Sequence, residues 1–233
     1  MSVKMNHILP PEILLKIFHY LTNLDMQVVV LVCRKWRELG ETPSLWTWDK
    51  WVTIRSHNMY ILESRMLLGK RLWIRGDWTP VEVEDLSQIL VRLNNLCCLD
   101  MCGINLSQVN PDVLGMIINK LENVNINKCQ LTSQQCETMF NIMVLATKLR
   151  MLVIGHNNLS TVDPGTLATA TNRLDYVTID HTVLTQQQVL CLLRQAATKT
   201  RLNTLVLRRA VVQGVGQQLI QEARQSIGSL YIW

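Results

Sequence analysis

The chain has 233 residues, of which 48% are apolar and 18% are charged, and this composition indicates a globular fold and excludes an intrinsically disordered chain. Lys and Arg number 23 against 18 Asp and Glu, and the formal net charge of +5 is spread along the chain without a basic run of five or more. This charge permits acidic partners but gives no reason to expect nucleic-acid binding.

The first residues of the chain and the spacing of its cysteines indicate the cellular compartment in which the protein is expected. Residues 1–7 are polar overall and carry no secretory signal, and the longest apolar run, 28–33, is too short to span a bilayer. Seven cysteines at irregular spacing fit a reducing compartment better than a disulfide framework. We therefore expect a soluble intracellular protein, cytoplasmic or nuclear, that binds no membrane.

Two amphipathic helices are predicted within residues 9–46. Pro11 suits the first turn of a helix, where its missing N–H costs nothing. The apolar residues that follow repeat at spacings of three and four, and they are Ile13, Leu14, Ile17, Phe18 and Leu21. A second helix is expected from about Asp25, which can cap it, through Leu39, with Gly40 ending it. Two short helices cannot bury so many apolar side chains between themselves, so an apolar surface should remain for a partner to cover.

The same stretch resembles an F-box. The resemblance lies in the Leu9-Pro10-x-Glu12 opening and the Pro43-x-Leu45-Trp46 close, with matching residues in order between them. It implies a three-helix module that docks on a Skp-family adaptor, which joins a cullin scaffold carrying a RING protein. The adaptor contacts that it implies are Leu9, Pro10, Glu12, Ile13, Leu14, Ile17, Phe18, Leu21, Val32, Trp36, Leu45 and Trp46. The alternative is a plain helical hairpin whose Leu and Trp side chains form only its core.

A connecting segment is expected over residues 47–68. It is rich in large side chains, including Trp48 and Trp51, and it contains no Gly or Pro, unlike a flexible linker. We predict that it is helical and packed, with both Trp side chains in the core of the junction. The predicted domains are therefore an F-box over 1–46, a helical linker over 47–68 and repeats over 69–233.

An internal repeat occupies the rest of the chain. Seven short strand-like segments start at intervals of 27, 25, 28, 25, 28 and 25 residues. Their first residues are Leu72, Leu99, Val124, Leu152, Val177, Leu205 and Leu230. The L-x-x-L-x-L pattern, with Cys129 and Asn157 at a following turn, is similar to the leucine-rich repeat. The predicted fold class is α/β: a three-helix F-box followed by a short solenoid of about seven strand-helix repeats, with a parallel sheet on its concave face.

Helices are expected between the strands. Cap and proline signals mark their starts at Thr79-Pro80-x-Glu82, Asn110-Pro111, Thr132, Asp163-Pro164 and Thr185. At the turn position, four copies carry Asp77, Ile104, Thr182 and Ala210 in place of Cys or Asn, which affects the local turn geometry alone. No single strand-helix unit can bury its own apolar face, so the units should stack into a curved array.

Alternate residues of each strand should point outward and form the concave face. Because Trp, Tyr and Arg dominate binding hot spots, we expect contacts to a target protein from this face. The predicted target-binding residues are Trp73, Arg75, Asp100, Asn125, Tyr176, Asp180, Arg208 and Tyr231. The alternative is that they are solvated sheet positions. Trp233, the final residue, is expected to seal the last repeat or to touch the adaptor.

The sequence contains no catalytic constellation and no cofactor motif. Cys97, Cys98 and Cys102 lie close together, but Cys97 and Cys98 should point to opposite faces of a strand, and no C-x-x-C or paired His accompanies them. His156 and His181 occupy equivalent loop positions, where a surface role is expected. We therefore expect a non-enzymatic protein without a metal or cofactor.

Two functions are consistent with these patterns. In the first, which the F-box resemblance implies, the protein is the substrate receptor of an SCF-type ubiquitin ligase, and its repeats hold a target so that ubiquitin transfer becomes effectively intramolecular. In the second, it is a binding scaffold that sequesters a partner without ubiquitin transfer. Copurification of a cullin would distinguish the two.

Overall fold

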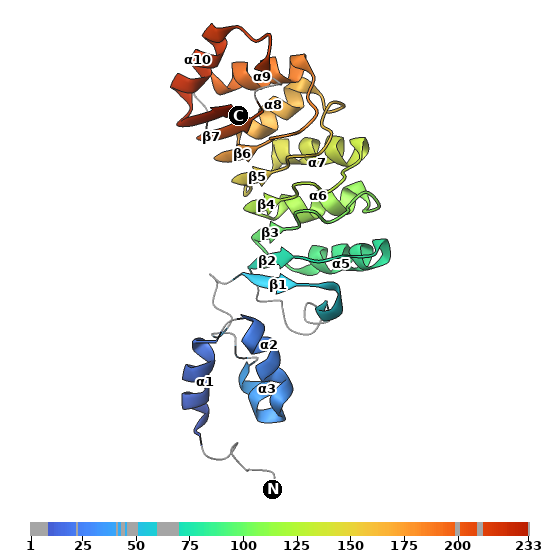
Figure 1. Cartoon of the computed structure of the whole chain (residues 1–233), viewed down its shortest axis with the longest axis vertical. Helices are drawn as coiled ribbons and strands as arrows, with labels where there is room; N and C mark the ends of the chain where they lie inside the picture. Colours follow the sequence, from blue (N-terminus) through green and yellow to red (C-terminus); the bar gives the residue numbers. More distant parts are fainter. Residues whose placement is uncertain are drawn as a thin grey trace.

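The structure is a computed structural model that describes residues 9–21, 23–40, 42, 45, 51–59, 70–198, 201–208 and 212–232 (Figure 1). Within these residues, a helical N-terminal part precedes a region in which strands and helices alternate along the chain. The N-terminal helices are α1 (Pro11–His19), α2 (Asn23–Val32) and α3 (Arg34–Gly40). The strands are β1 (Val52–Ile54), β2 (Arg71–Ile74), β3 (Cys98–Asp100), β4 (Asn123–Asn125), β5 (Met151–Val153), β6 (Tyr176–Thr178), β7 (Thr204–Leu207) and β8 (Ser229–Ile232). The helices between them are the 3-10 helix η3 (Ser56–Asn58), α5 (Pro80–Arg92), α6 (Pro111–Asn119), α7 (Ser133–Leu145), α8 (Pro164–Asn172), α9 (Gln186–Ala196) and α10 (Gln217–Ser226).

The three N-terminal helices enclose a small core of their own. Leu14 and Phe18 lie four residues apart on α1, so they share the face that packs against the other helices. The fully buried residues of this core are Leu14, Phe18, Met26, Val29 and Leu45. The ring of Phe18 meets that of Trp36 edge-on, with 5.2 Å between the centroids. This core is separate from the larger one under the sheet.

The predicted second helix, from Asp25 through Leu39, is divided in two. Helix α2 ends at Val32 and α3 begins at Arg34, and Cys33 between them is not helical. The backbone N–H of Trp36 donates to Sγ of Cys33 at 3.5 Å, so the Cys33 side chain caps α3 as a Ser or Asn would. The prediction of one continuous helix was wrong, because a local cap interrupts an apolar pattern that continues past it.

Among the described residues, eight strands form one parallel sheet in which spatial order follows sequence order, from β1 to β8 (Figure 1). All seven predicted strand-like segments are present, as β2 to β8. Their first apolar residues lie in register: Leu72 pairs with Leu99, Leu99 with Val124, and the series continues to Leu230. Parallel strands need a crossover connection, and helices α5 to α10 supply it. Figure 1 shows α5 to α9 stacked along one side of the sheet.

The predicted caps of helices α5 to α9 are confirmed, whereas Asp25, predicted to cap the second helix, lies inside the first turn of α2. Three capping boxes pair Thr79 with Glu82, Thr132 with Gln135 and Thr185 with Gln188, and Asn110 and Asp163 each accept a backbone N–H. Two of the capping residues also reach the preceding unit. Nε2 of Gln135 donates to the carbonyls of Leu106 and Val109 at 2.7 and 2.6 Å, and Gln188 does the same to Leu159 and Val162. The caps therefore tie consecutive strand-helix units together.

The turn after a strand is held by a buried polar side chain. Nδ2 of Asn157 donates to the carbonyls of Ile126 and Ile154, both at 2.9 Å, and its Oδ1 accepts the N–H of Leu131 at 3.2 Å. Sγ of Cys129 donates to the Met101 carbonyl at 3.1 Å, so both residues hold the turn at which the repeat pattern places them. Thr182 departs from the pattern, yet its hydroxyl donates to the Ile179 carbonyl at 2.7 Å.

The prediction of a helical linker over 47–68 is wrong for its described residues. Residues 52–54 form β1, which pairs with β2, and residues 56–58 form a short 3-10 helix. Val52 and Ile54 are buried, because β1 extends the sheet and covers the start of its apolar core. The Val52-x-Ile54 pattern matches the other strands but precedes Leu72 by less than one repeat period. The strand was therefore not predicted from the regular spacing. Trp48 lies outside the described residues.

The Asn157 turn leads to a test of stability. We expect Asn157→Leu to lower the free energy of unfolding by about 1–3 kcal/mol, because the Ile126 carbonyl and the Leu131 N–H lose a buried partner. Asn158→Ala, at the exposed neighbouring position, is the matched control. Denaturant unfolding followed by circular dichroism measures both, and equal stability of the two variants would refute the assignment.

Candidate functional site

The face of the sheet opposite the helices carries the side chains that alternate with buried ones. Strands β2, β4, β5 and β6 show the predicted alternation. Strands β3 and β7 depart from it, since Cys98 and Val206 are also buried. We call this surface the open face, and its side chains include Trp73, Asp100, Asn125, Val153, Thr178 and Tyr231.

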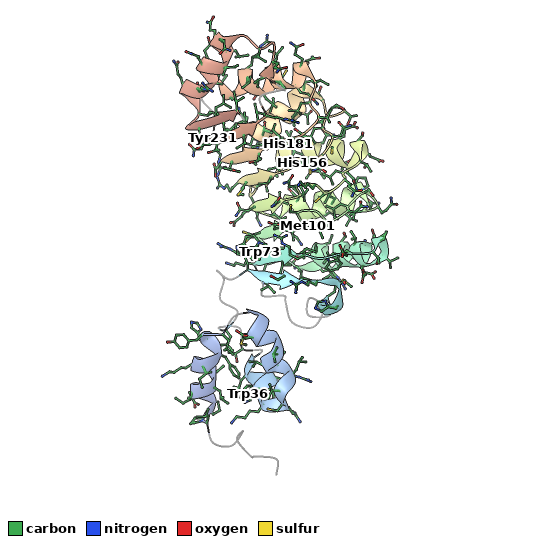
Figure 2. The ribbon with its side chains drawn as sticks, in the orientation of Figure 1. Trp36, Trp73, Met101, His156, His181 and Tyr231 are labelled. Atoms are coloured by element: carbon green, nitrogen blue, oxygen red, sulfur yellow. The ribbon has the colours of Figure 1, made fainter. Side chains whose placement is uncertain are left out.

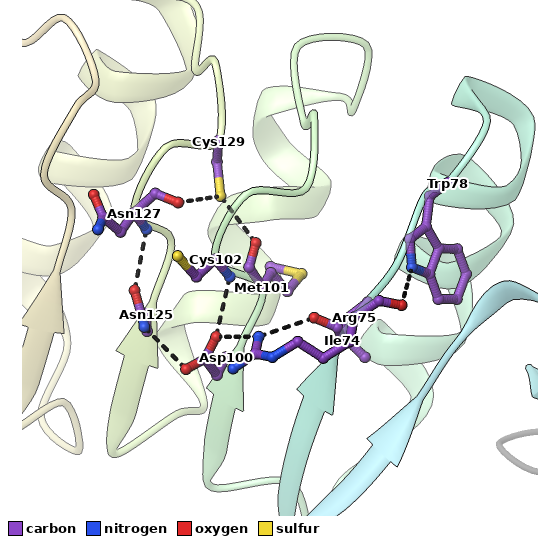
Figure 3. A network of polar contacts seen from close by, with 9 residues as sticks. All are labelled: Ile74, Arg75, Trp78, Asp100, Met101, Cys102, Asn125, Asn127 and Cys129. Atoms are coloured by element: carbon purple, nitrogen blue, oxygen red, sulfur yellow. Dashed lines mark hydrogen bonds and ion pairs between the residues drawn. The ribbon is translucent and has the colours of Figure 1, made fainter.

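A hydrogen-bonded network crosses the carboxyl ends of β2 to β4 (Figure 3). The Arg75 guanidinium donates to Oδ1 of Asp100 at 2.7 Å, and Nδ2 of Asn125 donates to Oδ2 of the same carboxylate at 2.9 Å. The backbone N–H of Cys102 donates to Oδ1 of Asp100 at 3.0 Å. Three predicted target-binding residues, Arg75, Asp100 and Asn125, are therefore brought together.

The surroundings of Asp100 act on its pKa in opposite directions. Burial raises the pKa, whereas hydrogen bonds from Arg75, the Cys102 N–H and Asn125 lower it, and the resulting pKa lies below the ordinary value. The hydrogen bond to Asp100 raises the pKa of Arg75 against the opposing effect of burial. Each partner therefore favours the charged form of the other.

Two tryptophans lie beside this network. The rings of Trp51 and Trp73 stack with 5.2 Å between centroids and 20° between planes. The guanidinium carbon of Arg75 lies 5.6 Å from the centroid of the Trp73 ring, within the range of a cation–π contact. Trp73 is 39% exposed. Trp51 was expected in the core of the junction, and the structure instead places it half-buried against Trp73, since β1 is part of the sheet.

A pocket of about 220 Å³ opens next to these residues. Trp51 and Met151 give it apolar walls, while Asp100, Asn125 and Arg71 add polar groups. Small-molecule sites are commonly about 300–1,000 Å³, so this pocket fits a single side chain of a protein partner better than a free ligand. Sequence reasoning did not find Trp51 or Arg71 as members of this site.

The other predicted target-binding residues lie farther along the sheet. They are Tyr176, Asp180, Arg208 and Tyr231. Oδ2 of Asp180 lies 3.5 Å from Nε2 of His181, and Tyr231 is exposed on β8. Figure 2 places Trp73 and Tyr231 toward opposite ends of the sheet, so the predicted residues form two groups rather than one site. Trp233 lies outside the described residues.

Two pairs of titratable side chains lie close together. The sulfur atoms of Cys97 and Cys98 are 3.7 Å apart, although the sequence predicted opposite faces. Both of their backbone N–H groups donate to the Lys70 carbonyl, so the chain does not yet alternate as a strand at Cys97. Burial and Cys98 raise the pKa of Cys97 to about 11, which disfavours a nucleophilic thiolate.

The rings of His156 and His181 stack with 4.5 Å between their centroids. Within the described ranges, no group of three His, Cys, Asp or Glu residues is suited to a metal.

The N-terminal helices present a second candidate site, an exposed apolar surface. Leu9, Ile13 and Ile17 follow one another at spacings of four and are 39%, 40% and 43% exposed. On α2, Val28, Leu31 and Val32 are each more than half exposed. We call these six residues the helical apolar surface. Exposed apolar side chains that recur along a helix in this way mark a candidate interaction site.

Comparison with protein-family models identifies this part of the chain. Residues 7–48 match the F-box-like family. The match ends before β1, so it covers none of the sheet. No curated protein matches the chain. Among the residues that the structure describes, no helix is both long and apolar enough to cross a membrane.

The F-box-like domain divides the predicted adaptor contacts between its surface and its core. Leu9, Pro10, Glu12, Ile13, Ile17 and Val32 are exposed, and Leu21 and Trp36 are half-buried. Leu14, Phe18 and Leu45 are buried within the domain, so their side chains pack its helices and are not offered to a partner. Trp46 lies outside the described residues. The sequence could not make this division, because both faces of α1 are apolar.

The Asp100 network leads to a prediction about pH. The folded-state pKa of Asp100 is below its ordinary value, so its contribution to stability is present above the unfolded pKa and is lost as pH falls through the folded pKa. We therefore expect the stability advantage of the unmodified chain over Asp100→Asn to disappear as pH falls below about 4. Thermal unfolding at several pH values measures this. The control is Asp85→Asn, which removes an exposed carboxylate on α5. The difference in stability between this variant and the unmodified chain should change less over the same pH range.

Proposed function

We propose that this protein is the substrate-recognition subunit of an SCF-type ubiquitin ligase. The F-box-like domain would dock on a Skp-family adaptor, which connects it to a cullin and a RING subunit. The observation that carries this proposal is the match of residues 7–48 to the F-box-like family together with apolar side chains exposed on α1 and α2 of that domain. Burial of such side chains stabilises a complex by about 25 cal/mol per Å² of apolar area removed from water, before the costs of association.

We further propose that the chain from β1 onward is a leucine-rich-repeat solenoid. Support comes from the regular spacing of its strands, their one-to-one register and the side chains of Cys129 and Asn157 that hold the turns. In a repeat array each unit contacts only its neighbours, so one face remains open along the whole length. That face would hold the target protein.

The protein would contribute position rather than chemistry. Fixing a target near a ubiquitin-loaded partner raises its effective concentration and needs no catalytic residue in the receptor. Support comes from the division of the chain into a helical apolar surface and a separate open face, each with its own core behind it. No cofactor or metal is part of this proposal.

Two aromatic side chains are the proposed anchors for the target. Trp73 and Tyr231 are among the large apolar side chains exposed on strands, and residues of this kind carry a large share of binding energy at interfaces. Around Trp73, the pocket beside Trp51 and the charged Arg75–Asp100 pair supply an apolar recess next to polar groups. This end of the open face is the better candidate for a hot spot.

The adaptor contact can be tested with a pair of matched variants. Ile13→Ala combined with Ile17→Ala should weaken adaptor binding by about 2–4 kcal/mol without unfolding the domain, because both side chains are exposed. Leu14→Ala, on the same helix but buried, should instead lower domain stability by about 2–5 kcal/mol. Adaptor pull-down and thermal unfolding measure the two effects. Undiminished adaptor binding by a folded double variant would refute the assignment of this surface.

Copurification tests the function as a whole. Cells expressing the tagged chain are treated with an inhibitor of the cullin complex, and the purified material is analysed by mass spectrometry. We expect the adaptor and cullin together with at least one protein that accumulates under inhibition. Recovery of a partner without any cullin would instead indicate a scaffold that sequesters it.

The target surface can be tested in the same experiment. Trp73→Ala should reduce recovery of the accumulating protein by about tenfold or more, since truncating a hot-spot Trp typically costs about 2 kcal/mol or more. Val81→Ala is the control, because Val81 is an exposed apolar residue on α5, away from the strands. Equal recovery by both variants would remove Trp73 from the proposed interface.

A further inference from the structure

Basic side chains occupy neighbouring turns at the carboxyl ends of β4 to β7. Lys128, His156 and His181 stand at equivalent positions of successive repeats, three residues after the last paired residue of each strand. Arg208 directly follows β7. All four side chains are exposed. We call these four residues the basic row.

The backbone fixes the spacing of the basic row. Lys128, His156 and His181 all have left-handed backbone, with φ of 57°, 59° and 54°. The N–H of Lys128 donates to the Gly155 carbonyl at 3.0 Å, and that of His156 donates to the Asp180 carbonyl at 3.1 Å. These bonds continue the parallel pairing past the strands, so consecutive positions of the row lie about 4.8 Å apart. The two imidazole rings agree with this spacing, since their centroids are 4.5 Å apart and their planes differ by 10° (Figure 2).

The groups that act on His156 are mainly basic. Burial, Lys128 and the two other basic groups, His181 and Arg208, lower the pKa of His156, whereas Asp180 raises it. Oδ2 of Asp180 lies 3.5 Å from Nε2 of His181, so this carboxylate is placed against the neighbouring ring. Two cations against one carboxylate leave a single positive charge while both histidines are neutral. Protonation of both rings raises this charge to three.

This charge is not compensated by other described side chains. Within the described ranges, no carboxylate forms an ion pair with Lys128 or Arg208. Two stacked imidazolium rings at 4.5 Å repel each other, and an anion beside them offsets that repulsion. The basic row therefore favours a negatively charged partner, and it favours one most strongly when both rings are protonated.

We propose that the basic row binds an extended acidic segment of the target protein, with carboxylates at every second position. Four positions span three strand spacings, or about 14 Å. In an extended chain, side chains on one face recur about every 6.6 Å, so three acidic residues at i, i+2 and i+4 match the length of the row. Hydrogen bonds between basic side chains and carboxylates are charge-assisted, which strengthens each contact.

The inference rests on the proposed function, because it gives the chemistry of the target that the repeats would hold. Arg208 is among the target-binding residues predicted from the sequence, and it continues the strand that carries Val206 on the open face. The acidic segment would therefore lie along one border of the open face. Anchors at Trp73 and Tyr231 would remain available to other parts of the same target.

Binding should strengthen as pH falls through the titration range of histidine. The ordinary pKa of His is about 6.5, whereas Asp and Glu stay ionised down to about pH 4. A bound carboxylate favours protonated imidazole and so raises the pKa of both rings, and by linkage their protonation raises the affinity. We expect an affinity about tenfold or more higher at pH 5.5 than at pH 7.5.

Fluorescence anisotropy on the whole 233-residue chain tests the proposal. The probe is a labelled nine-residue peptide in which Glu alternates with Ser, and the control peptide has Gln in place of Glu. His156→Asn combined with His181→Asn should reduce the pH effect to less than about threefold, and Asn tolerates the left-handed backbone at both positions. Lys128→Asn combined with Arg208→Gln should weaken binding about tenfold at both pH values while binding still strengthens in acid. The control variant, His57→Asn, removes an exposed histidine outside the row and should change neither.

Three results would overturn the proposal: equal binding of the Glu and Gln peptides at both pH values, a full pH effect in the double histidine variant, or an equal loss in His57→Asn. Preferential binding of a single-stranded oligonucleotide of similar length would also overturn it, since the row would then recognise phosphate. Thermal unfolding checks that each variant is folded, and His156→Asn alone replaces the double variant if the latter unfolds. The measurement uses no adaptor or cullin, so its failure would leave the proposed ligase function to the copurification experiment.

Discussion

The burial of each short strand by its neighbours is the constraint on which the structure depends. The strands have three or four residues, and their inward side chains, such as Leu72, Leu99 and Val124, are almost completely buried. No single strand-helix unit could achieve this alone, because the apolar area of one unit is closed only by the units on either side. The hydrogen bonds of Gln135 and Gln188 to the preceding unit act in the same direction. The sheet therefore stays in register along its length and presents its outward side chains at fixed spacing.

The F-box-like domain follows a different principle, since it is too small to hide its own apolar surface. Helix α1 has nine residues and is apolar on two faces. One face, with Leu14 and Phe18, closes the small core, while Ile13 and Ile17 remain exposed on the other. A helix with two apolar faces exposes one of them to water, which is unfavourable in free energy. This unfavourable term is removed when a second protein covers the exposed face. The helical apolar surface is thus what gives the domain its proposed role.

The charged side chains at the carboxyl ends of β2 and β3 compensate one another. There, Arg75 and Asp100 form an ion pair, and Asn125 completes the carboxylate's partners. Because these charges are paired within the protein, the site should discriminate between ligands by their shape more than by their charge.

Local patterns in the sequence were sufficient for most of the secondary structure, with β1 and the break between α2 and α3 as the exceptions. The repeat period located seven of the eight strands, and Thr79, Thr132 and Thr185 marked helix starts, because strand alternation and helix capping depend on residues a few positions apart. The same held for the open-face positions of Trp73 and Asp100, whose direction follows from alternation along one strand.

Only the tertiary structure decided the contacts between distant segments. It added β1 to the sheet, stacked Trp51 on Trp73, turned Leu14 inward and Ile13 outward, and placed His156 beside His181. Each of these outcomes depends on which of two chemically similar faces meets a neighbour, or on residues that a whole repeat separates. The pattern of apolar residues is the same in either case, so the sequence by itself determined most of the elements, and the packing of those elements determined the sites.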